Sequence, residues 1–424
     1  MKDDLTGRQI DDRIPISRGA LSWRGFLLVA GPGLVAQLAN TDAGSIITAA
    51  QSGAQWGYRL LLLQFLLIPI LYLVQELTVR LGLGTRKGYA QLVRQSFGRF
   101  WAFLSIVALV VSCFGALVTQ MSGLAGAGQV FGIPVWGTIA VTAAVIFLMV
   151  CTGSYRLVER IAIGLGLFEL AFLVVAWTAH PSFGQMLAQM REAPLTDPGF
   201  LYLSAANLGT SIIPWIVVYQ QSAIVDKGLV REHRSAARLD TFIGAVFCQV
   251  ITAAIVVAAA ATLGREGPDT GLQSVSQIAM ALVPTLGDTV GRVVFALGLS
   301  GGALVATVVV CLTAAWSIGE LIGVKHSLKD NPAEAPWFYV AFAVILLAGG
   351  GLVVSGVNLV RLAIAFGVIN ALLLPVVLGF LYRLACIALP PSDRLKGGYA
   401  IVAGLVLFLA AGFGVYAGIA GSLG

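Results

Sequence analysis

The sequence predicts an all-α membrane protein with eleven transmembrane helices, built as a five-plus-five inverted repeat in which the first and sixth helices are broken. The chain is 58% hydrophobic and 11% charged, with a mean hydropathy of +0.91, as is typical of integral membrane proteins. Its basic residues concentrate on alternate loops, and two apolar segments five helices apart are interrupted by small polar residues. Paired interruptions of this kind mark a binding site near the bilayer midplane.

Long apolar runs mark the expected spans, because about 20 apolar residues in a helix cross the hydrocarbon core of a bilayer. Residues 1–25 are polar and carry acids as well as bases, so we expect a cytoplasmic tail rather than a cleavable signal. Residues 26–424 are expected to form a single transmembrane domain. In chain order, the expected spans are 26–54, 59–80, 101–131, 134–152, 159–178, 201–225, 240–263, 289–322, 336–354, 359–386 and 398–421.

The distribution of lysine and arginine supports this number of spans. With the N-terminus in the cytoplasm, the inside segments hold 21 of the 26 basic residues, as the positive-inside rule requires. The C-terminus then lies outside, and the expected location is the cell (inner) membrane. The net charge of +6 is therefore an orientation signal, and we expect a lipid bilayer around the protein but no nucleic-acid partner.

Asp42 lies near the centre of the first expected span, within the small polar stretch 39–45. An ionised carboxylate at the centre of a bilayer costs about 2.5–3.5 kcal/mol and normally faces a bundle interior or a water-filled cavity. The residues around it are poor helix formers, and a helix broken there frees backbone carbonyls that can coordinate an ion. The sequence therefore predicts a cation site at this depth.

The sixth expected span carries a matching interruption. Pro214 removes a backbone donor from the helix, and Gly209, Thr210 and Ser211 precede it. An ordinary proline kink is the alternative, but the pairing with Asp42 favours a site shared by the two broken segments.

At this point the motifs resemble those of the NRAMP divalent metal transporters. The resemblance covers nearly the whole chain, and it implies the LeuT-like fold with a metal site between the first and sixth helices. The matching motifs are Gly31-Pro32-Gly33-Leu34, Asp42 in its broken helix, the stretch 75–82, Phe131-Gly132-Ile133-Pro134, Tyr155-Arg156 with Glu159, the stretch 209–214, and Leu374-Pro375.

Two departures from the family pattern bear on the metal. The family's Asp-Pro-Gly-Asn motif reads Asp42-Ala43-Gly44-Ser45 here, and its Met-Pro-His motif reads Ile213-Pro214-Trp215. Methionine sulfur is a soft ligand that favours transition metals, whereas Ile213 offers no ligand atom. The remaining donors are all oxygens, which suits Mg²⁺ because this ion dehydrates reluctantly. The expected metal site comprises the positions Asp42, Ser45, Ala39, Thr210, Ser211, Ile213 and Asn370; Asn370 has interhelical hydrogen bonding as its alternative role.

The family's proton pathway is altered as well. Its two sixth-helix histidines align with Trp215 and Gln220, and its third-helix acids align with Ala116 and Thr119. A proton relay at membrane depth needs titratable groups, so we expect transport without proton coupling. Histidines 180, 233 and 326 fall in expected loops. The intramembrane acids Glu169 and Glu320 are expected to pair with an arginine or a backbone donor, and Glu76 with Arg80 across one helical turn.

The expected function is therefore secondary transport of a divalent cation, Mg²⁺ first and Mn²⁺ second, by a monomer without a cofactor. The alternatives are a proton-coupled Mn²⁺/Fe²⁺ importer with a different relay, an organic-solute carrier in which Asp42 binds an amine, and a sensor without transport. An enzyme is the least favoured class, because nothing in the spans resembles a nucleophile–base pair.

Overall fold

The computed structural model describes residues 31–151, 155–263, 272, 277–278, 288–322, 333–356 and 358–423, with the backbone alone at 155–159, 288, 321 and 359. The expected tail 1–25, the side chains of the motif at 155–159 and His326 lie outside the described residues. All elements of the described part of the chain are helical. This agrees with the all-α prediction.

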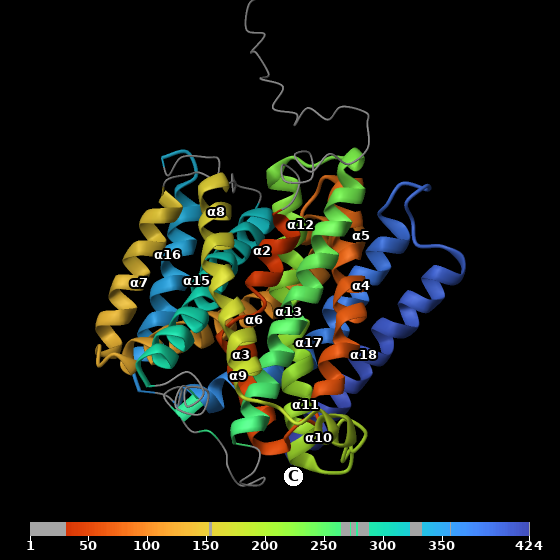
Figure 1. The fold of residues 1–424 in the computed structure, drawn as a ribbon. Coiled ribbons are helices and arrows are strands. Elements are labelled where there is room, and N and C mark those ends of the chain that lie inside the picture. The colour runs from red at the N-terminus through yellow and green to blue at the C-terminus, as the bar shows by residue number, and fades with distance from the viewer. Residues whose placement is uncertain are drawn as a thin grey trace, which may run out of the picture.

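The chain folds into long helices that stand roughly side by side, with shorter helices at their ends (Figure 1). In order they are α2 (Pro32–Leu38), α3 (Ala43–Trp56), α4 (Leu61–Thr85), α5 (Tyr89–Phe97), α6 (Arg99–Val130), α7 (Val135–Cys151), α8 (Tyr155–Gly166), η1 (Leu167–Leu170), α9 (Ala171–Thr178), α10 (Phe183–Gln189), α11 (Pro198–Ser211), α12 (Pro214–Lys227), η2 (Arg231–His233), α13 (Arg234–Thr262), α15 (Asp288–Ile322), α16 (Pro336–Val354), α17 (Leu359–Ile387) and α18 (Gly397–Leu423).

The observed helices match the expected spans. Within the described residues, nine helical segments are long and apolar enough to cross a bilayer. The expected fourth span forms α7, an apolar helix of 17 residues, and the expected first span forms the broken pair α2 and α3. The sixth span is also broken, between α11 and α12. The predicted membrane fold, with its first and sixth helices interrupted, is confirmed.

Four short elements lie outside these predictions, one of them the single 3₁₀ turn η2 between the sixth and seventh spans. Helices α5 and α10 contain nine and seven residues, which is too short for a search that looks for bilayer-length apolar runs. The remaining element, η1, interrupts the fifth span with one turn of 3₁₀ helix and contains Glu169. Such mid-helix turns often mark strain or function.

The two broken segments cross in opposite senses. The N-terminal half of the first, α2, packs against the C-terminal half of the sixth, α12, and α3 packs against α11. In Figure 1, α2 and α12 accordingly lie in the upper half of the molecule and α3 and α11 in the lower half. This antiparallel crossing is what an inverted repeat produces, and it brings both interruptions to the same depth.

The start of α2 is held by a residue of the seventh span. Asp240 on α13 accepts hydrogen bonds from the backbone N–H groups of Gly31 (3.2 Å), Gly33 (2.7 Å) and Leu34 (3.3 Å). These are the free donors that every helix N-terminus exposes. A Cβ on Gly33 would stand 2.7 Å from the Asp240 carboxylate, so only glycine allows this close approach. The Gly31-Pro32-Gly33 motif thus has a structural role in seating α2 on α13.

Candidate metal site

Asp42 lies at the break of the first segment and begins its second half. The residue has extended backbone angles and serves as the N-cap of α3, where its Oδ1 accepts a hydrogen bond from the Ser45 N–H at 2.7 Å. The side chain is buried. A carboxylate at a helix N-terminus is stabilised by the free N–H groups and by the helix dipole. The carboxylate is therefore held in a fixed orientation at mid-depth.

Gln120 on α6 holds the other side of this carboxylate. Its Nε2 donates to Asp42 Oδ2 at 2.6 Å, and its Oε1 accepts from the Ala43 N–H at 3.0 Å. One buried amide therefore fixes both the carboxylate and the first turn of α3. The sequence reasoning missed this residue because it searched the third span for acids. An amide near the middle of a long hydrophobic span was the available signal.

The second break lies between α11 and α12. Ile212 and Ile213 are non-helical, and Pro214 opens α12 at a position where its missing N–H is no loss. The last carbonyls of α11 consequently lack partners within the helix. The Thr210 and Ser211 carbonyl oxygens face the first broken segment instead, as their hydrogen bonds show.

Two side chains of the first segment, those of Ser45 and Asn40, donate hydrogen bonds to these carbonyls and so join the two breaks. Ser45 Oγ lies 3.1 Å from the Thr210 carbonyl oxygen and 2.8 Å from the Asn40 carbonyl oxygen, so its hydroxyl can donate to either. Asn40 Nδ2 donates to the Ser211 carbonyl at 2.9 Å. The structure thus brings Asp42, Ser45, Thr210 and Ser211 together around one point. Asn40 joins them as a residue that the predicted set did not contain.

Three other predicted positions differ in what they offer. Ala39 is the C-cap of α2, at the start of the break. Ile213 is buried at the N-cap of α12 and presents only hydrocarbon. Asn370 on α17 accepts a hydrogen bond from Ser112 on α6 at 2.7 Å, which is the interhelical role named as its alternative. The hydroxyl of Thr210 donates to the Asn207 carbonyl of its own helix at 3.2 Å.

The positions of the family's proton pathway hold no titratable group. Trp215 is fully buried, and Gln220 bridges Thr78 on α4 (2.9 Å) and Thr241 on α13 (2.7 Å). Thr119 donates to the Gly115 carbonyl at 2.9 Å, and its methyl group lies beside Gly44. A Cβ on Gly44 would stand 3.2 Å from both Asp42 Oδ1 and this methyl carbon, which is a tight contact.

The prediction that the remaining intramembrane acids are paired holds for Glu76 and Glu320 but not for Glu169. Glu76 pairs with Arg80 at 2.8 Å, as its i,i+4 spacing predicts, and Arg234 and Arg238 approach the same carboxylate. Glu320 accepts from the Gln91 N–H at 3.4 Å and from Ser222 at 3.2 Å. For Glu169 the prediction of an arginine or backbone donor was wrong: among the described residues neither an arginine nor a backbone N–H pairs with its carboxylate. A 3₁₀ turn inside a span turns this side chain into the bundle, away from the loops where arginines lie.

The donor set at the two breaks suits a cation that prefers oxygen. No group of three or more His, Cys, Asp or Glu side chains in the described part of the chain is arranged to hold a metal ion, so the donors that line the two breaks are one carboxylate, a hydroxyl, an amide and backbone carbonyls. Calcium- and magnesium-type ions take such oxygens. The nitrogen and sulfur ligands that favour zinc or copper are not gathered here.

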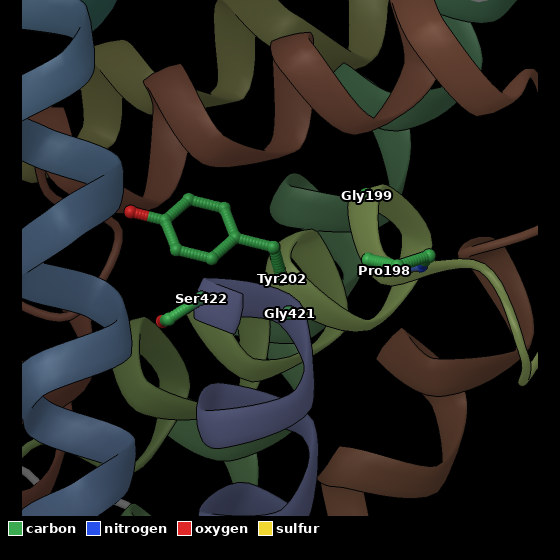
Figure 2. A pocket seen from close by; sticks show the side chains of 5 residues that line it. All are labelled: Pro198, Gly199, Tyr202, Gly421 and Ser422. Carbon is green, nitrogen blue, oxygen red and sulfur yellow. The ribbon is translucent and has the colours of Figure 1, made fainter. Parts of the chain in front are cut away.

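A separate cavity of about 520 Å³ lies at the start of α11 and the end of α18 (Figure 2). Its walls offer the hydroxyls of Tyr202 and Ser422 but no charged group, the other lining residues being Pro198, Gly199 and Gly421. Thirteen residues of helix, or about 20 Å, separate Pro198 from Ser211 at the break. This cavity therefore has neither the charge nor the position of a cation site.

Solved structures share the arrangement of the helices. The crystal structure of the Eremococcus coleocola manganese transporter in complex with an aromatic bis-isothiourea substituted compound superimposes with a TM-score of 0.77 at 19% identity, over 99% of this chain and 92% of that one. Mhp1, a nucleobase-cation-symport-1 family transporter, superimposes with a TM-score of 0.59 at 15% identity, over 92% and 90%. The fold is thus LeuT-like, that of a multi-pass membrane protein.

The sequence identifies the family. Residues 33–420 match the family described as "Natural resistance-associated macrophage protein-like", and the chain belongs to this NRAMP family. The divalent metal cation transporter MntH of Brucella suis biovar 1 is 30% identical over 301 residues, which are 68% of this chain and 65% of that protein. The chain therefore aligns with slightly less than two thirds of that relative's length. These relatives are transporters and not enzymes, in agreement with the sequence prediction.

Proposed function

We propose that the protein moves a divalent metal cation across the membrane by alternating access, that Mg²⁺ is the preferred ion with Mn²⁺ second, and that transport is not coupled to protons. The relatives named above support the divalent cation, since they are named for transport of divalent metals or of manganese. The choice of Mg²⁺ and the uncoupled mechanism rest on this chain's own residues.

The observation that carries the preference for Mg²⁺ is the set of oxygen donors that the two breaks bring together. Asp42, Ser45 and the carbonyls of Thr210 and Ser211 converge there, while Ile213 contributes hydrocarbon at the position where the family motif has methionine. A soft thioether favours transition metals over Mg²⁺. Without it, the site discriminates less against a hard ion that keeps part of its water shell.

The lack of titratable groups at Trp215, Gln220, Ala116 and Thr119 supports uncoupled transport. A divalent cation entering a cell gains free energy from the membrane potential, about 2.3 kcal/mol per charge per 100 mV. Inward movement of a dication therefore needs no second ion to drive it.

Uptake into proteoliposomes tests both parts of this proposal. Mg²⁺ and Mn²⁺ are supplied separately at an inside-negative potential, metal entry is followed with an internal indicator, and internal pH is followed with a second dye. We expect entry of both ions, Mg²⁺ at millimolar and lower concentrations, without acidification beyond that of protein-free vesicles. Mn²⁺ entry with acidification and without Mg²⁺ entry would contradict the proposal.

An ordinary proton-coupled Mn²⁺ importer is the second candidate function. The observation in its favour is that the relative from Brucella is named a divalent metal cation transporter and the structure from Eremococcus a manganese transporter. The same uptake experiment separates the two functions, because only the second acidifies the vesicle interior.

We further propose an inner-membrane monomer with a cytoplasmic N-terminus. Arg80, Arg234 and Arg238 come from two different spans, are all expected on the inside, and gather around Glu76. Asp393, from the expected inside loop between the last two spans, pairs with Arg231 and Arg234 at 2.9 and 3.2 Å. Labelling of an added C-terminal cysteine by a membrane-impermeant thiol reagent in intact cells tests this orientation, since it requires the C-terminus to lie outside.

A further inference from the structure

Glu169 is a buried carboxylate that the proposed function does not yet use. It lies in η1 within the fifth span and is fully excluded from solvent. Neither carboxylate oxygen accepts a hydrogen bond of ordinary geometry. The Thr41 hydroxyl is the polar group beside it, and that hydroxyl is directed at the Gln37 carbonyl, 3.4 Å away. Burying a charge without a partner is costly, so a buried acid in this position calls for a role.

The carboxylate faces the break of the first segment. A Cβ on Gly302 of α15 would collide with the Thr41 carbonyl oxygen and would stand 3.1 Å from Glu169 Oε1. Both oxygens therefore flank the same point on α15, and glycine there lets the helix approach them. Thr41 is the residue directly before Asp42.

The groups around Glu169 leave its charge available to a cation. The titratable groups that act on it are Asp42, at the break, and the Cys248 thiol, which α13 contributes beside both acids. No basic side chain among the described residues neutralises it, and η1 packs on α8, α9 and α15. A positive charge at the break would compensate the charge of this carboxylate.

We propose that Glu169 supplies the second negative charge for the divalent cation held at Asp42. This inference rests on the proposed function, because it assumes a divalent cargo. Asp42 alone leaves one positive charge of the ion uncompensated in a region of low dielectric, where uncompensated charge is expensive. Glu169 compensates it from behind Thr41 without direct coordination. The pair of acids then distinguishes a dication from a monovalent ion of similar size.

The size of the effect follows from Coulomb's law. At an effective dielectric constant of about 20, a carboxylate within about 10 Å of a dication strengthens its binding at least about tenfold after allowance for screening. Glu169→Gln keeps the size of the side chain and removes its charge. Glu169→Asp keeps the charge and moves it by about one methylene.

The test compares these two variants with Glu320→Gln, which removes an acid from the cytoplasmic end of α15, about 27 Å along the helix from Gly302. Purified proteins are titrated with MgCl₂ and with MnCl₂ by calorimetry, and thermal unfolding of each variant without metal is recorded. We expect Glu169→Gln to weaken binding of both ions at least tenfold, and Glu169→Asp and Glu320→Gln to bind within about threefold of the wild type.

Each outcome decides the proposal. Unchanged affinity in a folded Glu169→Gln variant overturns it. Equal losses in the Asp and Gln variants also overturn it, because a purely structural role would depend on shape and not on charge. If Glu169→Gln does not fold, Glu169→Asp still tests the proposal, because a tenfold loss in this charge-conserving variant overturns it. Failure of the wild type to bind either ion would instead refute the proposed function, which keeps the two failures apart.

Discussion

The Ser45 hydroxyl on α3 lies 3.1 Å from the carbonyl oxygen of Thr210, the penultimate residue of α11, although 165 positions separate the two residues in the chain. The contact joins the first broken segment to the sixth at the depth of Asp42. The same hydroxyl reaches the Asn40 carbonyl at 2.8 Å. One hydroxyl thus lies between two carbonyls that the interrupted helices leave free and can donate to either, and these are the oxygens that a bound cation would share.

Removal of this hydroxyl is the first prediction. Ser45→Ala leaves buried carbonyls without a donor, which costs about 1–3 kcal/mol of unfolding free energy, and it should reduce cation uptake because the two breaks lose their link. Ser317→Ala is the matched control, since Ser317 is equally buried and its hydroxyl has no hydrogen-bond partner in the described structure. Thermal unfolding and vesicle uptake are measured for both. A control that is as damaged as Ser45→Ala would contradict the assigned role.

Asp42 is expected to be indispensable for transport. Asp42→Asn removes the charge but keeps a good N-cap for α3, so the protein should fold while uptake of Mg²⁺ and Mn²⁺ falls at least about 100-fold. Asp42→Ala should also abolish uptake, with an additional loss of about 1 kcal/mol of stability from the missing cap. Uptake and size-exclusion profiles check this. Normal uptake by a folded Asp42→Asn protein would refute a cation site at this residue.

Gln120 should matter for both stability and transport. Gln120→Leu leaves the Asp42 Oδ2 and the Ala43 N–H without their partner, and a buried unsatisfied group costs about 1–3 kcal/mol. Gln249→Leu makes the same change at a similarly buried site on α13, where the amide forms no hydrogen bond in the described structure, so it should be neutral or stabilising. Thermal unfolding of the two variants gives the comparison. Equal melting temperatures would show that the Gln120 contacts contribute nothing.

The residues around Asp42 show what sequence reasoning could and could not reach. The eleven spans and both interruptions follow from local composition, because apolar length, a midspan acid and a proline each affect the structure at their own position in the chain. The partners Gln120 and Asp240 come from helices 78 and 207 positions away from the groups they hold. Such pairings depend on how the helices pack, and no local pattern encodes them. The sequence identified Glu169 as an intramembrane acid, but the direction of its side chain depends on a 3₁₀ turn that no sequence pattern predicts.

Ile213 should control the choice of metal. Ile213→Met adds a thioether at the second break and conserves volume, so the core should tolerate it at a cost below about 1.5 kcal/mol. A soft ligand favours transition metals, and we expect the ratio of Mn²⁺ or Cd²⁺ uptake to Mg²⁺ uptake to rise about tenfold. Ile212→Met is the control one residue earlier, at an equally buried position. An unchanged ratio in Ile213→Met would mean that residue 213 does not face the ion.

The attachment of α2 to the seventh span gives the last prediction. Asp240 accepts three backbone N–H groups of residues 31–34, and bonds to a charged acceptor contribute about 1.5–3 kcal/mol each at most. Asp240→Ala should therefore lower the unfolding free energy by at least about 2 kcal/mol and release α2 from α13. Asp240→Asn, which keeps one acceptor oxygen, should lose about half as much.

Release of α2 can be separated from general unfolding. A single cysteine introduced at Leu34, which is partly exposed beside the start of α2, reports on this segment through its rate of reaction with a thiol reagent in a background without the native cysteines. We expect labelling to accelerate in the order wild type, Asp240→Asn, Asp240→Ala, at temperatures well below the melting point of each protein. Because α2 leads directly into the break at residues 39–42, its release should also weaken cation binding at Asp42. Faster labelling with unchanged cation affinity would show that α2 moves independently of the site, and the anchoring role of Asp240 would then be structural alone.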